Sequence, residues 1–273
     1  MAKTKVKRKP SRKSVSKRKG KKKSARSRFL IFLFKSAVVL TCLVFFFVFS
    51  VYLGLFGPIP TKATLSRVKN NSATLVYSHD HRMVGKYFLQ NRMTIGEENI
   101  SQYVKDALVA TEDSRFFRHR GLDIRSLARV FVKTIVLGDR SQGGGSTISQ
   151  QLARNLYHRS DYGKFTLPIN KVREIFISAR LEKVYSKDEV LALYLNTVPF
   201  GDNTYGIEVA SQRFFGKASA QLNPAEAATI VGMLAANTAY NPRVNPEKSL
   251  QRRNIVLDRM ASQGVISQEE AKK

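Results

Sequence analysis

The sequence predicts a mainly α-helical domain behind a single N-terminal transmembrane helix, with a small β-hairpin between the two. Three observations predict this fold class. An uncharged apolar run is long enough to cross a bilayer, apolar residues recur at helical spacing in much of the later chain, and several helix-capping sequences mark helix starts. Two β-like runs around a turn predict the hairpin.

Residues 1–28 form a basic tail that carries 15 Lys or Arg and no Asp or Glu, within a chain of net charge +27. Such a segment has almost nothing apolar to bury and is typical of a disordered arm. Its charge suits nucleic acid or anionic lipid. The apolar run that follows favours lipid contact and a topology signal, so no nucleic-acid partner is expected.

Residues 29–56 form the expected transmembrane anchor. The 21 residues from 36 to 56 carry no charge, which is enough to cross about 30 Å of hydrocarbon at about 1.5 Å per residue. A cleavable signal has a shorter apolar stretch and a small-residue cleavage site. By the positive-inside rule, the basic tail is cytoplasmic and residues 57–273 lie on the outer side.

The exported part is expected to hold a linker and a β-hairpin at 57–99 and a helical domain at 100–273. Cys42 is the only cysteine in the chain and lies in the anchor. Neither a disulfide nor a cysteine-based metal site is therefore expected outside the membrane.

Several elements of the exported part have recognisable signals. The hairpin is expected at 73–88 and a helix at 100–112. A helix at 123–137 carries three cations beside an apolar surface, which fits either the membrane interface or an ordinary protein core. The last capping sequence lies so near the final residue that its helix is expected to continue further. Helix starts are expected at Thr147, Ser186, Asn223 and Ser267.

Glu112, in the segment ATEDSRFFRHRG at 110–121, is the first candidate for chemistry. It ends a helix beside Asp113, and a carboxylate in such a place suits a general base. The local sequence fits equally well a Glu-Asp pair that is bound to Arg115 or Arg118.

A second cluster is the glycine-rich segment GGGSTISQQLARN at 143–155. It runs into a helix N-terminus, where free backbone N–H groups can bind phosphate. The Gly-Lys-Ser/Thr ending of a Walker A loop is absent. Arg154 can extend this site beyond Gln150 and Gln151, although Thr147 and Gln150 also suffice as helix caps.

A third cluster, NKVREIF at 170–176, places Lys171 and Glu174 on one helix face. A surface ion pair is the default interpretation of this spacing.

With LALYLNTVPFGDNTYGIEVASQRFFGK and GMLAANTAYNP further on, these clusters resemble the five successive motifs of the peptidoglycan glycosyltransferases of family 51. That family forms the polymerase domain of class A penicillin-binding proteins and the monofunctional transglycosylases. The resemblance covers about residues 73–271. It implies that 100–273 is a lysozyme-like glycosyltransferase domain with a larger head lobe and a smaller, membrane-contacting jaw.

The resemblance also implies a reaction, the polymerisation of lipid II into β-1,4 glycan strands with release of undecaprenyl pyrophosphate. Glu112 matches the catalytic base, which takes the proton from the 4-hydroxyl of the acceptor sugar, and the anomeric carbon is inverted. Glu174 matches the second essential glutamate. In the family this glutamate acts on the pyrophosphate, either directly or through a divalent cation such as Mg or Mn. The resemblance assigns no definite metal ligands and implies no organic cofactor.

Further residues fall on motif positions to which the resemblance assigns substrate binding. Lys171, Arg154 and the helix start at Ser146 and Thr147 would supply positive charge to the leaving group. The full set is Asp113, Phe116, His119, Ser146, Thr147, Gln150, Gln151, Arg154 and Lys171.

The sequence departs from the family at Asn170, where the third motif usually has Arg. One cationic contact is therefore in doubt, and Arg173 or Arg180 is a candidate to replace it. Some members carry a transpeptidase domain that needs a Ser-x-x-Lys motif. Ser14-Val15-Ser16-Lys17 has this spacing in the tail, and none is expected in the exported part.

The implied location is the bacterial inner membrane, in a single pass, with the catalytic domain on the periplasmic or extracellular side. The implied partners are lipid II, the growing glycan strand, membrane lipids and proteins of the cell-wall synthesis complex. A lytic transglycosylase and a catalytically inert membrane scaffold are the alternatives. The first needs no pyrophosphate site, and the second does not need Glu112.

Overall fold

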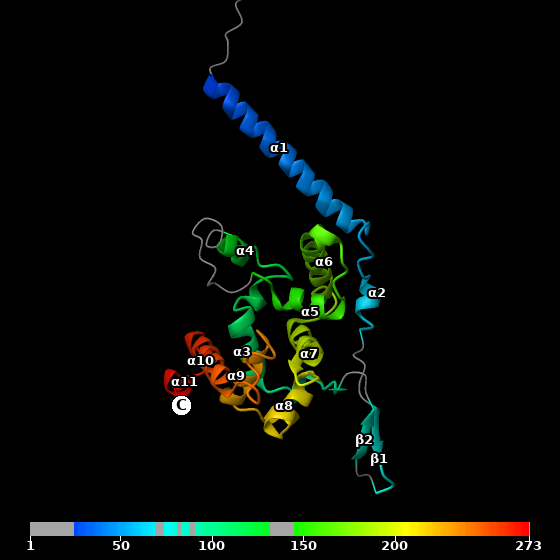
Figure 1. The fold of residues 1–273 in the computed structure, drawn as a ribbon, viewed down its shortest axis with the longest axis vertical. Helices are drawn as coiled ribbons and strands as arrows, with labels where there is room; N and C mark the ends of the chain where they lie inside the picture. The colour runs from blue at the N-terminus through cyan, green and yellow to red at the C-terminus, as the bar shows by residue number, and fades with distance from the viewer. Residues whose placement is uncertain (1–24, 69–73, 81–82, 88–90, 132–144, 273) are drawn as a thin grey trace, which may run out of the picture. The chain divides into compact units, whose positions relative to one another are not determined.

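The computed structural model describes residues 25–68, 74–80, 83–87, 91–131 and 145–272 (Figure 1). The chain divides into two compact units, residues 1–49 and residues 50–273. Within the described residues the fold is mainly α with two small sheets, which confirms the predicted fold class. The second part of the helix expected at 123–137, from residue 132 on, lies outside the described residues.

The first unit contains most of helix α1, Ala25–Tyr52, whose 28 residues span about 42 Å. Most of its side chains are apolar and exposed, with Phe45 and Phe46 each 71% exposed. Among the described residues, Arg28–Tyr52 is the one helix long and apolar enough to cross a membrane, by length and composition. A helix without a polar face is suited to lipid rather than to water.

The segment that follows α1 is hydrogen-bonded to later residues of the second unit. The Arg180 guanidinium donates to the carbonyl oxygens of Ile59 at 3.0 Å and Pro60 at 2.9 Å. The Tyr185 hydroxyl donates to the carbonyl of Leu65 at 2.7 Å, at the end of the short helix α2, Lys62–Leu65. The first part of the expected linker therefore has a fixed path along the domain.

One expectation about this segment is wrong. Ser66-Arg67-Val68-Lys69 has Ser-x-x-Lys spacing within the exported part. In the structure the Ser66 hydroxyl donates to the carbonyl of Ala63, so it completes the end of α2. The companion transpeptidase motifs Ser-Asp-Asn and Lys-Thr-Gly are absent from the sequence.

The two sheets are small. Strands β1, Thr74–Tyr77, and β2, Met83–Tyr87, pair antiparallel, which confirms the hairpin predicted at 73–88. The second sheet has the order β3-β5-β4, from Asn91–Arg92, Thr204–Tyr205 and Pro199–Gly201. Asp202 and Asn203 connect β4 to β5 with φ of 47° and 55°, the left-handed region that Asn and Asp tolerate in tight hairpin turns.

One group of packed helices holds the end of the first motif. Helix α3, Gln102–Glu112, packs against α9, Pro224–Met233, and α10, Pro246–Ser262. Their apolar stripes are fully buried where they meet, as at Leu108 and Ile230. Burying such side chains contributes about 1.5–3 kcal/mol each, which holds the C-terminal end of α3 in place. The short α11, Gln268–Lys272, packs on α10.

A second group holds the second and third motifs. Helix α5, Ile148–Leu156, packs against α6, Thr166–Leu181, and α7, Lys187–Thr197. The remaining elements connect or flank the two groups. They are η1, Glu97–Asn99; η2, Phe116–Arg118; α4, Ile124–Phe131; η4, Gly163–Phe165; α8, Ile207–Phe215; and η5, Ser219–Gln221.

The predicted helix starts are confirmed at Ser186 and Asn223, which form full capping boxes with Glu189 and Glu226. Ser267 also exchanges hydrogen bonds with Glu270. The helix start at Thr147 is confirmed but has only one of the two hydrogen bonds of a capping box. Its threonine hydroxyl accepts from the backbone three residues on, but the Gln150 side chain turns elsewhere.

Candidate active site

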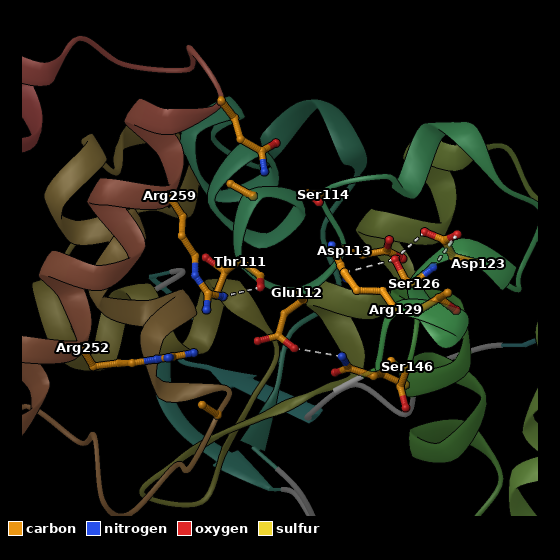
Figure 2. Close-up of a pocket in the computed structure, with 16 residues that line it drawn as sticks. Thr111, Glu112, Asp113, Ser114, Asp123, Ser126, Arg129, Ser146, Arg252 and Arg259 are labelled. Atoms are coloured by element: carbon orange, nitrogen blue, oxygen red, sulfur yellow. Dashed lines mark hydrogen bonds between the residues drawn. The ribbon is translucent and has the colours of Figure 1, made fainter. Parts of the chain in front are cut away.

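Glu112 is the last residue of α3 and lines a cavity of about 550 Å³. Figure 2 shows its carboxylate between Arg252 and Arg259 on one side and Ser146 on the other. Helix α3, the chain leading into α4, the start of α5, and α10 all contribute to the wall. The cavity therefore brings the first two motifs together with α10, which begins 91 residues after the second motif ends.

One oxygen of the Glu112 carboxylate is held by the protein. Its Oε2 accepts a hydrogen bond of 2.9 Å from the Gln151 side-chain amide on α5. The Gln151 Oε1 in turn accepts from the Tyr194 hydroxyl on α7, also at 2.9 Å. Among the described residues no hydrogen bond reaches Glu112 Oε1, so this oxygen is available for a molecule in the cavity.

Asp113 and His119 join the first motif to α5. The buried Asp113 carboxylate accepts from the backbone N–H of Ile148 at 3.1 Å, at the start of α5. It also lies 3.0 Å from His119 Nε2. A carboxylate at a helix N-terminus is stabilised by the free N–H groups there. Asp113 lines the cavity, and its contacts fix the position of Glu112 next to it.

Two residues expected to bind substrate have little or no exposed surface, although Thr147 lines the cavity. Phe116 is fully buried, and its ring lies under Lys187, whose Nζ is 4.1 Å from the ring centroid. It has no surface to offer a substrate, which corrects that prediction. Thr147 is 2% exposed, and its hydroxyl donates to the carbonyl of Gly121 at 2.8 Å. Its side chain caps and fixes α5.

A cation lies at the start of α5. Lys171, on α6, donates to Ser146 Oγ at 2.6 Å and to Gln150 Oε1 at 2.8 Å. Burial lowers the pKa of Lys171, and the charge of Glu174 opposes the change. Arg154 is exposed on α5 and close enough to act on Lys171 electrostatically. Ser146 lines the cavity together with Glu112, so Lys171 contacts the cavity wall through this serine.

Glu174 is buried and paired with two cations. Its Oε1 accepts from Arg159 Nε at 2.8 Å and lies 2.8 Å from Arg159 Nη2. Its Oε2 lies 3.5 Å from Lys171 Nζ. The residues that the structure describes contain no group of three or more His, Cys, Asp or Glu that could hold a metal ion. With both oxygens facing cations, Glu174 fits a divalent metal poorly.

The structure explains the departure at Asn170. This side chain is buried and donates to the carbonyls of Ser160 at 2.8 Å and Thr166 at 2.7 Å, so it stabilises the loop before α6. Neither of the two arginines expected to compensate lines the cavity of Glu112. Arg180 binds the linker carbonyls described above, and Arg173 donates to the Tyr162 hydroxyl at 3.0 Å. Arg159, which no sequence motif singled out, supplies a cation beside Glu174.

Helix α10 contributes two further arginines that the sequence analysis also missed. Arg259 donates to the carbonyl of Thr111 at 2.7 Å, one residue before Glu112. The last carbonyls of a helix lack partners within it, so Arg259 closes the end of α3. Arg252 lies over the ring of Tyr240, 5.6 Å from its centroid. A spacing of seven residues places both arginines on one helix face, which is the signal that could have found them.

Asp123 shapes the opposite wall. Its carboxylate accepts from the backbone N–H groups of Arg125 at 3.0 Å and Ser126 at 3.2 Å, and so caps the start of α4. Arg115 Nε lies 3.0 Å away. Arg115 therefore pairs with Asp123, not with the Glu-Asp pair. Burial raises the pKa of Asp123, but these hydrogen bonds and the charge of Arg115 outweigh it, and the pKa is lowered.

A cavity lined by the Glu112 carboxylate and by the start of α5 has the groups that acid–base chemistry requires. A family model described as Transglycosylase matches residues 80–261. This is more than half of the chain, and the chain therefore belongs to the Transglycosylase family.

The chain is also similar in sequence to curated proteins. The chain is 36% identical over 242 residues to penicillin-binding protein 1A of Pseudomonas aeruginosa, covering 89% of this chain and 29% of that protein. It is 37% identical over 212 residues to penicillin-binding protein 1A of Escherichia coli, covering 78% and 24%. The chain thus spans less than a third of the length of these relatives. The crystal structure of penicillin-binding protein 1A from Haemophilus influenzae gives a TM-score of 0.42 at 24% identity, covering 75% of this chain and 20% of that one.

Proposed function

We propose that this chain is a peptidoglycan glycosyltransferase that polymerises lipid II into β-1,4 glycan strands and releases undecaprenyl pyrophosphate. Membership of the Transglycosylase family supports a glycosyl transfer, and the relatives are named penicillin-binding proteins. The observation that carries the proposal is the cavity lined both by Glu112 and by Ser146, the residue at the start of α5 to which Lys171 donates a hydrogen bond.

Glu112 Oε1 would take the proton from the 4-hydroxyl of the acceptor sugar. The hydroxyl oxygen attacks the anomeric carbon of the donor strand, the bond from that carbon to the pyrophosphate oxygen breaks, and the configuration inverts. A base positioned for such a step contributes about 10²- to 10⁴-fold in rate. The hydrogen bond from Gln151 holds the other oxygen, so Oε1 has a fixed direction.

The electron pair of the broken bond leaves on the pyrophosphate, whose negative charge must be stabilised as it develops. Lys171 lies where it can meet that charge, at 2.6 Å from Ser146 Oγ on the cavity wall. Arg159 and Arg154 add positive charge near it. The N-terminus of α5 adds its partial positive charge.

No step of this mechanism runs through a metal ion, because Glu174 is already paired with Arg159 and Lys171. In this proposal Glu174 holds the two cations at the pyrophosphate site. A divalent cation can still neutralise the released pyrophosphate, which titration of Mg²⁺ and Mn²⁺ against a chelator would measure.

We also place the protein in the bacterial inner membrane by a single pass through α1, with the catalytic domain on the outer side. The length and composition of Arg28–Tyr52 and the basic residues 1–28 support this placement. Lipid II, the growing strand, membrane lipids and proteins of the cell-wall synthesis complex are the proposed partners.

The test is polymerisation of labelled lipid II by the detergent-solubilised full chain. We expect polymer from the wild type and none from Glu112→Gln, which keeps the size of the side chain and removes the base. Glu247→Gln, at an exposed glutamate in the first turn of α10, is the matched control and should polymerise like the wild type. Polymer from Glu112→Gln would refute the assigned base. Release of short products from finished glycan, without polymer, would support a lytic enzyme instead.

A further inference from the structure

The orientation of the proposed base depends on one neighbouring amide. Among the described residues, Gln151 Nε2 is the group that donates to the Glu112 carboxylate. The two residues are 39 apart in the sequence and lie on different helices, so nothing local fixes their relation. Any group that controls the Gln151 amide therefore also controls the direction of Glu112.

A glutamine side-chain amide has an oxygen that accepts hydrogen bonds and an NH₂ group that donates them. Rotation by about 180° about its last bond exchanges the oxygen with the NH₂ group at little intrinsic cost. With NH₂ toward Glu112, the carboxylate gains a hydrogen bond. With the oxygen toward Glu112, two acceptors would face each other and the carboxylate would turn away.

Tyr194 favours the first of these two orientations, because rotating the amide would take away the oxygen that accepts its hydroxyl proton. Its side chain is 2% exposed, and a buried hydroxyl must find a hydrogen-bond partner. Its hydroxyl donates to Gln151 Oε1 at 2.9 Å, which holds that oxygen away from Glu112. Burial raises the pKa of Tyr194, and the charge of Glu112 raises it further while Arg154 opposes, so the hydroxyl keeps the proton that it donates.

We propose that Tyr194 is a positioning residue for the general base, acting through Gln151. Its hydroxyl fixes the side-chain amide so that the NH₂ group faces Glu112. The inference rests on the proposed function for its effect on the rate, but the hydrogen-bonded relay itself does not. Tyr194 does not line the cavity, so it acts without touching the substrate.

The direct test is Tyr194→Phe, which removes the hydroxyl and keeps the ring that packs in the core. The amide then loses the donor that orients it, and Glu112 is held less well. We expect kcat for lipid II polymerisation to fall about 10- to 100-fold with KM unchanged, because misplacing a reacting group costs rate and not ground-state binding.

Tyr185→Phe is the matched control. It deletes an equally engaged hydroxyl, which donates at 2.7 Å to the carbonyl of Leu65, away from the cavity. This variant should keep both kcat and KM. Thermal unfolding of the two variants shows whether any loss of activity follows from lost stability.

A double-mutant comparison separates the relay from a general packing role. Gln151→Ala removes the group through which Tyr194 is inferred to act. The double variant Gln151→Ala with Tyr194→Phe should therefore have the same kcat as Gln151→Ala alone. If the two losses multiply instead, Tyr194 acts independently of Gln151 and the proposal is wrong.

A spectroscopic measurement tests the relay without any activity. The ¹⁵N side-chain amide signal of Gln151 in the detergent-solubilised full chain is assigned by its loss in Gln151→Ala. It should shift in Tyr194→Phe and stay in place in Tyr185→Phe. An unchanged signal in Tyr194→Phe overturns the relay, whatever the activity. If the wild type makes no polymer but the signal shifts, the proposed function fails and the relay stands.

Discussion

Replacing Lys171 by methionine tests the proposed leaving-group site most directly. The change keeps most of the aliphatic stem and removes an ammonium group that donates to Ser146 Oγ at 2.6 Å and Gln150 Oε1 at 2.8 Å. If this group also meets the departing pyrophosphate, its loss removes a charged hydrogen bond. Such a bond contributes about 1.5–3 kcal/mol, or about 10- to 150-fold in rate.

The loss should appear mainly in kcat. The negative charge on the pyrophosphate grows as its bond to the sugar breaks, so the cation stabilises the transition state more than the bound substrate. The assay is the initial rate of lipid II polymerisation over a range of substrate concentrations. A rise in KM alone, with kcat unchanged, would mean that Lys171 only binds substrate.

Lys217→Met is a close control. Its side chain is 33% exposed like that of Lys171, but its ammonium lies 2.8 Å from Glu226 Oε1 and not beside a residue that lines the cavity. It should polymerise like the wild type. If Lys171→Met were as active as Lys217→Met, the assignment of the leaving-group site would be refuted.

The acidity of Lys171 gives a second readout. Burial lowers its pKa, so the free enzyme loses this positive charge at a lower pH than an exposed lysine would. The basic limb of the kcat/KM profile should report that loss. In Lys171→Arg the guanidinium stays charged, and the basic limb should move to higher pH even if the peak rate is lower. A basic limb that does not move would assign it to another group.

Three further predictions concern stability and geometry. Arg259→Leu should leave the carbonyl of Thr111 without its partner, lower the free energy of unfolding by about 1–3 kcal/mol in chemical denaturation and reduce kcat, whereas Arg259→Lys should recover part of both. Asn170→Arg should restore the motif residue without raising activity, and should lower the melting temperature, because two hydrogen bonds of a buried side chain are lost. Asp123→Ala should lower the free energy of unfolding at neutral pH by about 0.5–2 kcal/mol through loss of the α4 cap. The depressed pKa of Asp123 means that this stability is present above the ordinary aspartate range and is lost as the pH falls below it, so the wild type and variant should converge in acid.

Exposed apolar side chains flank both the segment after α1 and the start of α6. Phe165 and Leu167 are 65% and 67% exposed, and Leu53 and Leu55 are 61% and 71% exposed. The ring of Phe56 lies against Tyr162 at 5.8 Å, so these segments are adjacent. Such side chains suit a bilayer interface and are consistent with the proposed membrane location.

Much of the fold followed from local sequence. The uncharged apolar run, the helix periodicity and the capping boxes at Ser186 and Asn223 each depend on residues within a few positions of one another. Local physics acts over the same distance, so the helices and their starts could be predicted. The prediction that Lys171 and Glu174 share one helix face rested on the same kind of local spacing.

The orientation of individual site residues could not be predicted this way. Phe116 lies on a motif position but is fully buried, and Asn170 faces the loop before α6. A motif gives the identity of a residue at a position. Whether its side chain faces the cavity or the core depends on the helices packed around it.

By itself, the sequence determined the mainly helical fold, the apolar N-terminal helix and the identity of Glu112 as the candidate base. Only the tertiary structure decided what surrounds that carboxylate. Gln151 and Tyr194 reach it from two other helices, and the arginine that closes its helix lies 148 residues from its partner. These contacts are made between elements that are far apart in the chain and are set by how the helices bury their apolar faces, and no local pattern of residues records that packing.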